Sequence, residues 1–172
     1  MEGRFAFGAC SLFAVVGCLS GCAGATFRDG VYEDEYVKYR VATSLPGFSR
    51  AEVGDNDLAF HRDGYGTIGV NSTCTEYEDV PDVALVNHLL FDTTSRRFTT
   101  EETVTLDGRG ARHVVARVEL DGVPVEIELY VMKKDGCVFD LTHVRSVSAP
   151  PEVREVFLEF VQRFSVLQVR LP

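Results

Sequence analysis

Four histidines are the side chains best suited to metal binding or acid–base chemistry near neutral pH. Zinc-type sites bring two or more imidazoles together, often one helical turn apart as in H-x-x-x-H. No histidine of this chain has such a partner in the sequence, so we expect each to lie at the surface or at the edge of the core. The sequence therefore predicts no metal site and no cofactor, and the four residues are His61, His88, His113 and His143.

Pairs that could act in nucleophilic or acid–base catalysis are also poorly placed. Asp140 and His143 are three residues apart on a predicted strand, which puts their side chains on opposite faces of a sheet. Ser72 and Ser146 lack the G-x-S-x-G context of a nucleophile elbow. We expect no catalytic residue.

Two carboxylates remain to be considered. Glu126 and Glu128 share one face of a predicted strand, where they could enter a cleft, but a solvated sheet surface is the usual place for such residues. A hydrolase site assembled in space from Asp140, His143 and Glu128 stays open as a hypothesis.

Length and charge limit the class of protein. The chain has 172 residues, 45% of them hydrophobic, enough for one domain with one core. Its formal net charge is -9, and binding to nucleic acid through phosphates requires clustered Lys and Arg. We therefore expect no nucleic-acid partner.

The stretch from Thr99 to Ser146 organises the predicted fold. Three Asp-Gly pairs divide it into four apolar-rich runs, and Asp-Gly tolerates the positive φ of a type I′ turn. The sequence predicts a four-stranded antiparallel meander with one face in the core and the other partly wet. The pairs are Asp107-Gly108, Asp121-Gly122 and Asp135-Gly136.

Further elements are expected before the meander, from strand alternation, turn residues and helix-start signals. The first helix should bury Val83, Val86, Leu89 and Leu90. In order, we expect a strand at Tyr36–Ala42, a hairpin of Asp57–Arg62 and Thr67–Thr75, a helix at Pro81–Phe91 and a polar turn at Thr93–Arg97.

A second helix follows Pro150-Pro151. Its apolar residues recur at i, i+3, i+4 and i+7, which favours a helix laid across the sheet, although an aromatic stripe could also line a lipid-binding groove. The stripe consists of Val153, Val156, Phe157, Phe160, Val161 and Phe164. The fold class expected is α+β: an antiparallel sheet made of an N-terminal strand, a hairpin and the meander, packed with two main helices.

The N-terminus reads as an export signal. Arg4 precedes the apolar run Phe5–Leu19, and Leu19-Ser20-Gly21-Cys22 resembles the lipobox of bacterial lipoproteins. The resemblance implies cleavage before Cys22, attachment of a diacylglyceryl group to its thiol and a membrane-anchored protein. Because Ala23 rather than Asp follows, it also implies the outer membrane facing the periplasm. The alternative is a secreted protein cut elsewhere, with Cys22 unmodified.

Removal of the signal leaves Cys74 and Cys137 in the domain. Outside the cytoplasm two such cysteines often form a disulfide, while two separate buried thiols are the alternative. The expected organisation is a signal peptide at 1–21, a lipid anchor and tether at 22–35, and a single α+β domain at 36–172.

The predicted order of elements resembles the Mog1/PsbP-like fold, shared by lipoproteins similar to DcrB, from about Asp29 to Leu167. Short segments add to this likeness: Gly30-Val31-Tyr32, Asn71-Ser72-Thr73-Cys74 and Gly136-Cys137-Val138-Phe139-Asp140-Leu141. The resemblance implies a non-enzymatic docking or assembly role for a membrane-associated complex, such as a transport system, with an envelope protein as partner. A small-molecule or lipid carrier is the alternative hypothesis.

Overall fold

The computed structural model describes residues 24–54, 56–74 and 80–171. The predicted signal peptide and Cys22 lie outside these residues. The elements, in chain order, are β1 (Thr26–Arg28), β2 (Val31–Glu33), β3 (Val37–Arg40), β4 (Ser49–Ala51), β5 (Leu58–Arg62), β6 (Gly66–Thr73), α1 (Asp82–Leu89), β7 (Thr93–Leu106), β8 (Arg109–Leu120), β9 (Val123–Lys134), β10 (Cys137–Ser146), α2 (Glu152–Gln162) and β11 (Ser165–Val169).

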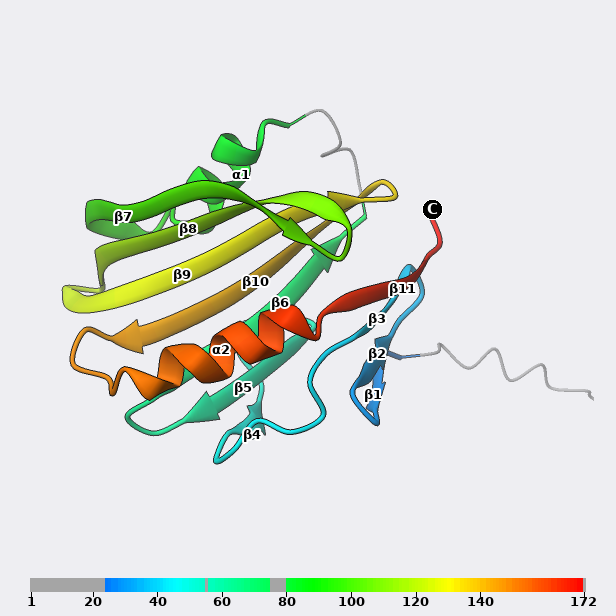
Figure 1. Cartoon of the computed structure of the whole chain (residues 1–172), viewed down its shortest axis with the longest axis horizontal. Helices are drawn as coiled ribbons and strands as arrows, with labels where there is room; N and C mark the ends of the chain where they lie inside the picture. The colour runs from blue at the N-terminus through cyan, green and yellow to red at the C-terminus, as the bar shows by residue number, and fades with distance from the viewer. Residues whose placement is uncertain (1–23, 55, 75–79, 172) are drawn as a thin grey trace, which may run out of the picture.

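Two antiparallel sheets form the domain. The larger has seven strands in the order β4-β5-β6-β10-β9-β8-β7, and the smaller has four in the order β1-β2-β3-β11. Figure 1 shows α2 crossing one face of the large sheet, with α1 on the opposite side beside β7 and β8. The mainly antiparallel sheet with two helices confirms the α+β class, while the division into two sheets was not predicted.

The three Asp-Gly turns connect the four strands of the meander, β7 to β10. Asp107, Asp121 and Asp135 have φ of 46°, 51° and 53°, and the glycine after each is also in the positive-φ region. This is the backbone that a type I′ turn requires. The first strand begins earlier than expected: Thr93–Arg97, predicted as a polar turn, lies within β7, whose register shifts between Thr94 and Arg97.

The N-terminal part of the domain corrects a second prediction. Residues 26–33, expected within the tether at 22–35, form the hairpin of β1 and β2. Tyr32 in this hairpin is buried and stacks on Tyr39 of β3 with ring centroids 4.9 Å apart. The tether therefore cannot extend to residue 35, because the fold already includes Thr26. The last strand, β11, was not predicted and pairs with β3.

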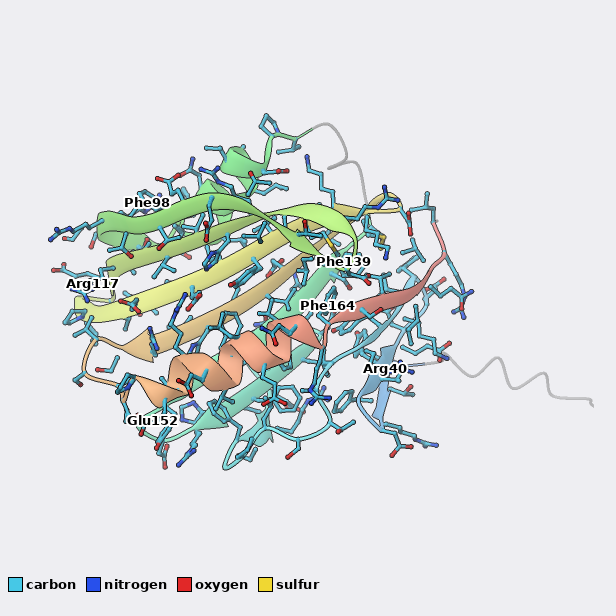
Figure 2. All side chains as sticks on the ribbon, viewed as in Figure 1. Arg40, Phe98, Arg117, Phe139, Glu152 and Phe164 are labelled. Atoms are coloured by element: carbon cyan, nitrogen blue, oxygen red, sulfur yellow. A yellow bond between two sulfur atoms is a disulfide. The ribbon has the colours of Figure 1, made fainter. Side chains whose placement is uncertain are left out.

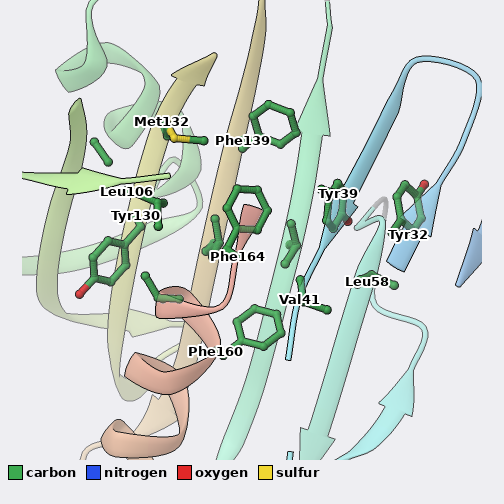
Figure 3. Close-up of a cluster of buried hydrophobic side chains, with 14 of the residues drawn as sticks. Tyr32, Tyr39, Val41, Leu58, Leu106, Tyr130, Met132, Phe139, Phe160 and Phe164 are labelled. Carbon is green, nitrogen blue, oxygen red and sulfur yellow. The ribbon is translucent and has the colours of Figure 1, made fainter. Parts of the chain in front are cut away.

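Each helix covers its own apolar cluster. On the α2 side, Tyr39 of β3 packs against Phe139 of β10 and Phe164 after α2, with ring centroids 6.2 Å and 5.5 Å away, so the small sheet is tied into the main core (Figure 3). Phe157 and Phe160 are fully buried there, as the stripe predicted for the last helix requires. The face expected to be partly wet is therefore a second core face where α2 covers it, while Arg117 near its edge is exposed.

On the α1 side, the alternating aliphatic residues of β8 and β9 are buried as expected, including Val114, Ile127 and Leu129. The face of α1 itself is rotated from the prediction. Val83 is 54% exposed and Leu85 is buried in its place, because Leu85 and Val86 both point to the sheet. Among the described residues, no helix is long and apolar enough to cross a membrane.

Candidate functional site

The two domain cysteines lie at neighbouring ends of two paired strands. Cys74 follows β6 and Cys137 begins β10, and their Sγ atoms are 2.08 Å apart, a disulfide bonding distance. The bond spans 63 residues of chain. It links the hairpin before α1 to the meander after it.

Two of the four histidines are not where the sequence analysis expected them. His113 and His143 are buried, with 4% and 0% of their surface exposed, so the surface interpretation is wrong for both. His61 and His88 are exposed as expected. Within the described ranges, no three His, Cys, Asp or Glu side chains converge to hold a metal ion.

Glu128 is also buried, which corrects its expected place on a solvated surface. Only 1% of it is exposed, because α2 packs over this face of β9. Arg154, in the first turns of α2, donates from Nε and Nη2 to the two carboxylate oxygens at 3.0 Å each. Its neighbour Glu126 lies nearer the edge and pairs with Arg117 and Arg145.

His113 continues this network across β8. Its Nε2 is 2.9 Å from a Glu128 oxygen and its Nδ1 is 2.9 Å from Glu102. Burial alone would lower the pKa of His113, but the hydrogen bonds to Glu128 and Glu102 raise it above the ordinary value of 6.5. With a carboxylate at each nitrogen, the ring is the doubly protonated imidazolium. Glu102, His113, Glu128 and Arg154 thus alternate in charge and join α2 to the sheet.

His143 is a different kind of buried imidazole. Its Nε2 donates to the carbonyl of Tyr65 at 3.1 Å, and its Nδ1 has no hydrogen-bond partner among the described residues. Burial lowers the pKa of His143 to about 4, so the ring is neutral at physiological pH. The side chain packs on Phe157 of α2, with ring centroids 5.1 Å apart. It is a core residue.

Asp140 and His143 lie on opposite faces of β10, as predicted. His143 faces α2, whereas Asp140 faces the α1 side, so they form no dyad. Ser72 donates to Asp57 at 2.6 Å, and Ser146 contacts Ser148. In the described structure, neither serine is hydrogen-bonded to a histidine.

The α1 side of the large sheet holds a groove that sequence reasoning missed. Among the described residues, helix α1 packs mainly on β9 and β8, and residues of β6 and β10 line hollows beside it. Two hollows of about 160 Å³ and 260 Å³ meet there and share Asn71, Leu89 and Asp140. We call this the Asp140 groove. Its other lining residues are Asn56, Thr73, Leu85, His88, Ile127, Leu129, Val131, Val138, Thr142 and Val144.

A glycine keeps the groove open at its β5–β6 end. Gly69 pairs with Thr142 across the strands, and a Cβ at position 69 would lie 2.9 Å from Thr142 Oγ1 and 3.1 Å from Asn56 Oδ1. Both contacts are too close for an ordinary side chain. The lack of a side chain at Gly69 therefore lets these two polar groups lie side by side in the groove wall.

Asp140 is the charged group at the centre of the groove. Only 6% of it is exposed, and it lies opposite Asn71 in the β6–β10 register. Burial raises the pKa of Asp140, a hydrogen bond with Asn71 lowers it and the nearby carboxyl of Asp57 raises it, so that the net pKa is about 7. A carboxyl with such a pKa gains or loses its proton near neutral pH. It can donate to a neutral ligand or accept from a cationic one.

Asp140 makes the domain less stable as pH rises. The folded state holds the proton of Asp140 more tightly than the unfolded chain, whose Asp pKa is about 3.9. The stabilisation that comes from this proton is therefore fully present below about pH 4 and is lost as the pH rises through about 7. The Asn side chain of Asp140→Asn cannot ionise. We therefore expect the free energy of unfolding of the variant, relative to that of wild type, to rise by on the order of 2–4 kcal/mol from pH 4.5 to pH 8.5. Urea unfolding at both pH values measures this. Wild-type and variant stabilities that change in parallel with pH would contradict it.

A third hollow, of about 260 Å³, lies at the far end of the meander and is lined by Arg109, Lys133 and Lys134. Each cation there has an acidic partner: Asp135 for Arg109, Asp82 for Lys133 and Asp107 for Lys134. Their charges are thus balanced within the domain. Asp140 lacks such a counter-charge among the residues lining its groove, which makes the groove the stronger candidate for a site.

Comparison with known proteins adds to the description of the fold. No protein-family model and no curated protein matches the sequence. Cyanobacterial PsbP from Synechocystis superposes with a TM-score of 0.53 at 16% identity, covering 87% of this chain and 99% of that one. The domain has a PsbP-like fold. This bears out the resemblance inferred from the order of elements, at the level of fold.

Two further structures are similar. LpqN, involved in cell envelope biogenesis of Mycobacterium tuberculosis, has a TM-score of 0.52 at 11% identity, with 76% of this chain and 84% of that one covered. A protein from Bacteroides thetaiotaomicron has a TM-score of 0.52 at 8% identity over 77% of this chain. The chain spans about half of that protein, 46% of its length. At these identities the likeness concerns the fold alone.

Proposed function

We propose that this protein is a lipid-anchored envelope lipoprotein whose PsbP-like domain is a non-enzymatic accessory module for a membrane-associated complex. The Asp140 groove is the part of the domain that binds the partner. The observation that carries this proposal is the open sheet face beside α1, where a buried, unbalanced carboxyl lies among apolar walls. Such a combination is typical of binding sites.

Three other observations support the proposal. The lipobox at Leu19–Cys22 predicts an acylated Cys22, and LpqN, one of the structural neighbours, takes part in cell envelope biogenesis. The buried His113 and Glu128, which a hydrolase would need free, are instead engaged with Glu102 and Arg154 in an ion-pair chain that fixes α2.

The proposal also predicts how the domain sits at the membrane. Cys22 is four positions before Thr26, the first residue of β1, so extended chain separates them by at most about 14 Å. A tether this short holds the small sheet close to the lipid headgroups. The module therefore works near the bilayer surface, where a membrane-associated complex would meet it.

Cellular fractionation tests the anchor. We expect Cys22→Ser, expressed behind an export signal that is cleaved without lipidation, to move from the membrane fraction to the soluble fraction, because the chain then carries neither acyl chains nor the apolar run Phe5–Leu19. Intact mass spectrometry of wild type should show the matching acyl mass. The soluble Cys22→Ser protein should unfold at the same urea midpoint as wild type.

The matched control is Cys74→Ser, which removes a domain cysteine and should leave the protein in the membrane fraction. Membrane attachment of Cys22→Ser equal to wild type would refute the anchor. An unmodified, differently cleaved N-terminus in wild type would do the same, and would favour the secreted alternative.

The carrier hypothesis keeps one observation in its favour. The two hollows of the groove, of about 160 Å³ and 260 Å³, together reach the lower part of the roughly 300–1,000 Å³ range of small-molecule sites. Native mass spectrometry of the purified protein would show a retained small molecule if this function holds. Protein of apo mass, with no thermal stabilisation by added lipids, would remove the carrier hypothesis.

A further inference from the structure

We infer that the Asp140 groove recognises a protonated primary amine on a short aliphatic stem. This inference rests on the proposed function and adds the chemistry of the group that binds. The amine is carried either by a lysine side chain of the partner or by a small free amine. The distinction between these two sources belongs to the experiment below.

The charge of the groove favours a cationic ligand. Asp140 lies at the junction of the two hollows, and Asp57 is close enough to influence its ionisation. Lys and Arg are absent from the lining residues of either hollow, and the domain around them belongs to a chain of net charge -9. A cation that enters the groove thus pairs with Asp140 and does not have to displace a Lys or Arg side chain.

The polar groups around Asp140 suit an ammonium head. An ammonium group has three donors and no acceptor, so it requires several oxygens. Besides the carboxylate, the groove offers the side-chain oxygens of Asn71, Thr142 and Asn56. Gly69 holds the last two within reach of one another, as its two close Cβ contacts show. The site can therefore replace most of the water that an amine loses on binding.

The remaining walls suit an aliphatic stem. Leu89 of α1 lies above the groove, while Ile127 and Leu129 of β9 form part of its base. These side chains contact methylene groups favourably, at roughly 0.8 kcal/mol for each CH₂ buried. A short alkylammonium thus matches the groove at both ends. A carboxylate ligand would face Asp140 with like charge.

The test is a nuclear magnetic resonance titration of the full mature protein in a zwitterionic detergent, followed through the side-chain resonances of Asn71 and Leu89. The probe is n-butylamine, with n-butanol and butyrate as matched neutral and anionic controls. At pH 8 we expect the amine to bind at least tenfold more tightly than the alcohol. Equal binding of amine and alcohol, or tighter binding of butyrate, would overturn the inference.

Two variants sharpen the test. Asp140→Asn should remove the preference for the amine, whereas Asp121→Asn makes the same chemical change at an exposed turn and should retain it. The pH dependence of wild type keeps the test valid if Asp140→Asn folds poorly. Affinity for the amine should fall about tenfold from pH 8 to pH 6, because a proton then occupies Asp140.

Among the described residues that line the groove, His88 on α1 is the other titratable group. The carboxyl of Asp57 influences Asp140 from the opposite face of β6, where Ser72 and Tyr39 donate to it. Lys133 of β9 borders the groove beside Val138 and pairs with Asp82 of α1. His88→Gln should leave this pH dependence in place, and its loss would contradict the assignment to Asp140. Nα-acetyl-lysine amide distinguishes the sources of the amine. Binding as tight as that of butylamine indicates a partner lysine, and binding of butylamine alone indicates a small free amine.

The result is separable from that of fractionation. Failure of every amine to bind, with Cys22→Ser still released from the membrane, removes the amine assignment and leaves the anchored module intact. Amine binding by a protein that is not acylated removes the anchor and retains the site.

Discussion

Replacing Glu128 by glutamine is expected to lower the free energy of unfolding by about 3–5 kcal/mol, a cost typical of breaking a buried ion pair. Figure 2 shows α2 lying across the sheet, with Glu152 labelled at the start of the helix that carries Arg154. Glu128 accepts hydrogen bonds from Nε and Nη2 of Arg154 and from His113, and is itself 1% exposed. The neutral amide leaves both cations without their shared counter-charge.

Burial raises the pKa of Glu128, but the hydrogen bonds from His113 and Arg154 outweigh it and hold that pKa below 4.5. The carboxylate is therefore ionised, and its contribution to stability is lost only as pH falls through this lowered value. Stability measured by urea unfolding near pH 6 should show the full effect of Glu128→Gln. At that pH His113, whose pKa is raised, is also charged.

Glu101→Gln is the matched control, because Glu101 pairs with Arg112 at 2.8 Å on the same sheet but is 45% exposed. An exposed pair contributes about 0–1 kcal/mol, so this variant should unfold almost as wild type does. Equal effects of the two substitutions would show that the Glu128 network does not fix α2 to the sheet.

Removing the disulfide should have an effect of similar size. A bond that closes a loop of 63 residues restricts the unfolded chain, and by the loop-entropy relation contributes about 4 kcal/mol. We expect the double variant Cys74→Ser/Cys137→Ser to unfold at a much lower urea concentration than wild type. Addition of a thiol reductant should shift wild type toward the variant.

The variant supplies its own control, because its unfolding midpoint should not respond to the reductant. A wild-type midpoint that is equally insensitive, together with two free thiols by mass spectrometry, would contradict the bond. Cys137 and Val138 begin the strand that carries Asp140, so reduction of the disulfide should weaken amine binding. The loss should be smaller than that caused by Asp140→Asn, because the carboxyl group is still present.

The parts of the fold that sequence predicted best depend on local signals. Asp107, Asp121 and Asp135 each precede a glycine, and two adjacent residues suffice to specify a type I′ turn. The stripe of α2 is local as well, since its period is visible within one segment. The hairpin of β5 and β6 follows from a short loop with two glycines at positive φ, Gly64 and Gly66.

The errors arise where the outcome depends on distant parts of the chain. Glu128 and His113 were assigned to the surface because alternation alone cannot tell whether a helix 26 residues further along will cover that face. Similarly, residues 26–33 look polar and turn-like, yet β1 pairs with β2, and the more distant strand β3 gives the backbone of β2 a second partner. Val83 was predicted to be buried but is exposed, and Leu85 is buried in its place. The prediction failed because α1 is short and has only a weak apolar periodicity.

The Asp140 groove was missed for a related reason. Asn56, Asn71, Asp140 and Thr142 come from three separate stretches, and the pairing of β6 with both β5 and β10 brings them together. One signal was present in the sequence: Asp140 is an acidic residue inside an otherwise apolar strand. An acidic residue at such a position indicates either a buried hydrogen-bond or ion-pair partner or a binding site. In this structure Asp140 lines the groove.

Site-specific photo-crosslinking in intact cells tests the central claim, that the groove binds a partner in the envelope, most directly. A photoreactive amino acid at His88, which lines the groove, should form an adduct with one envelope protein, and Asp140→Asn should reduce that adduct strongly. The same probe at Val83, exposed on the same helix but outside the groove, should form none. Adducts of equal yield from both positions, or an adduct unaffected by Asp140→Asn, would contradict the account.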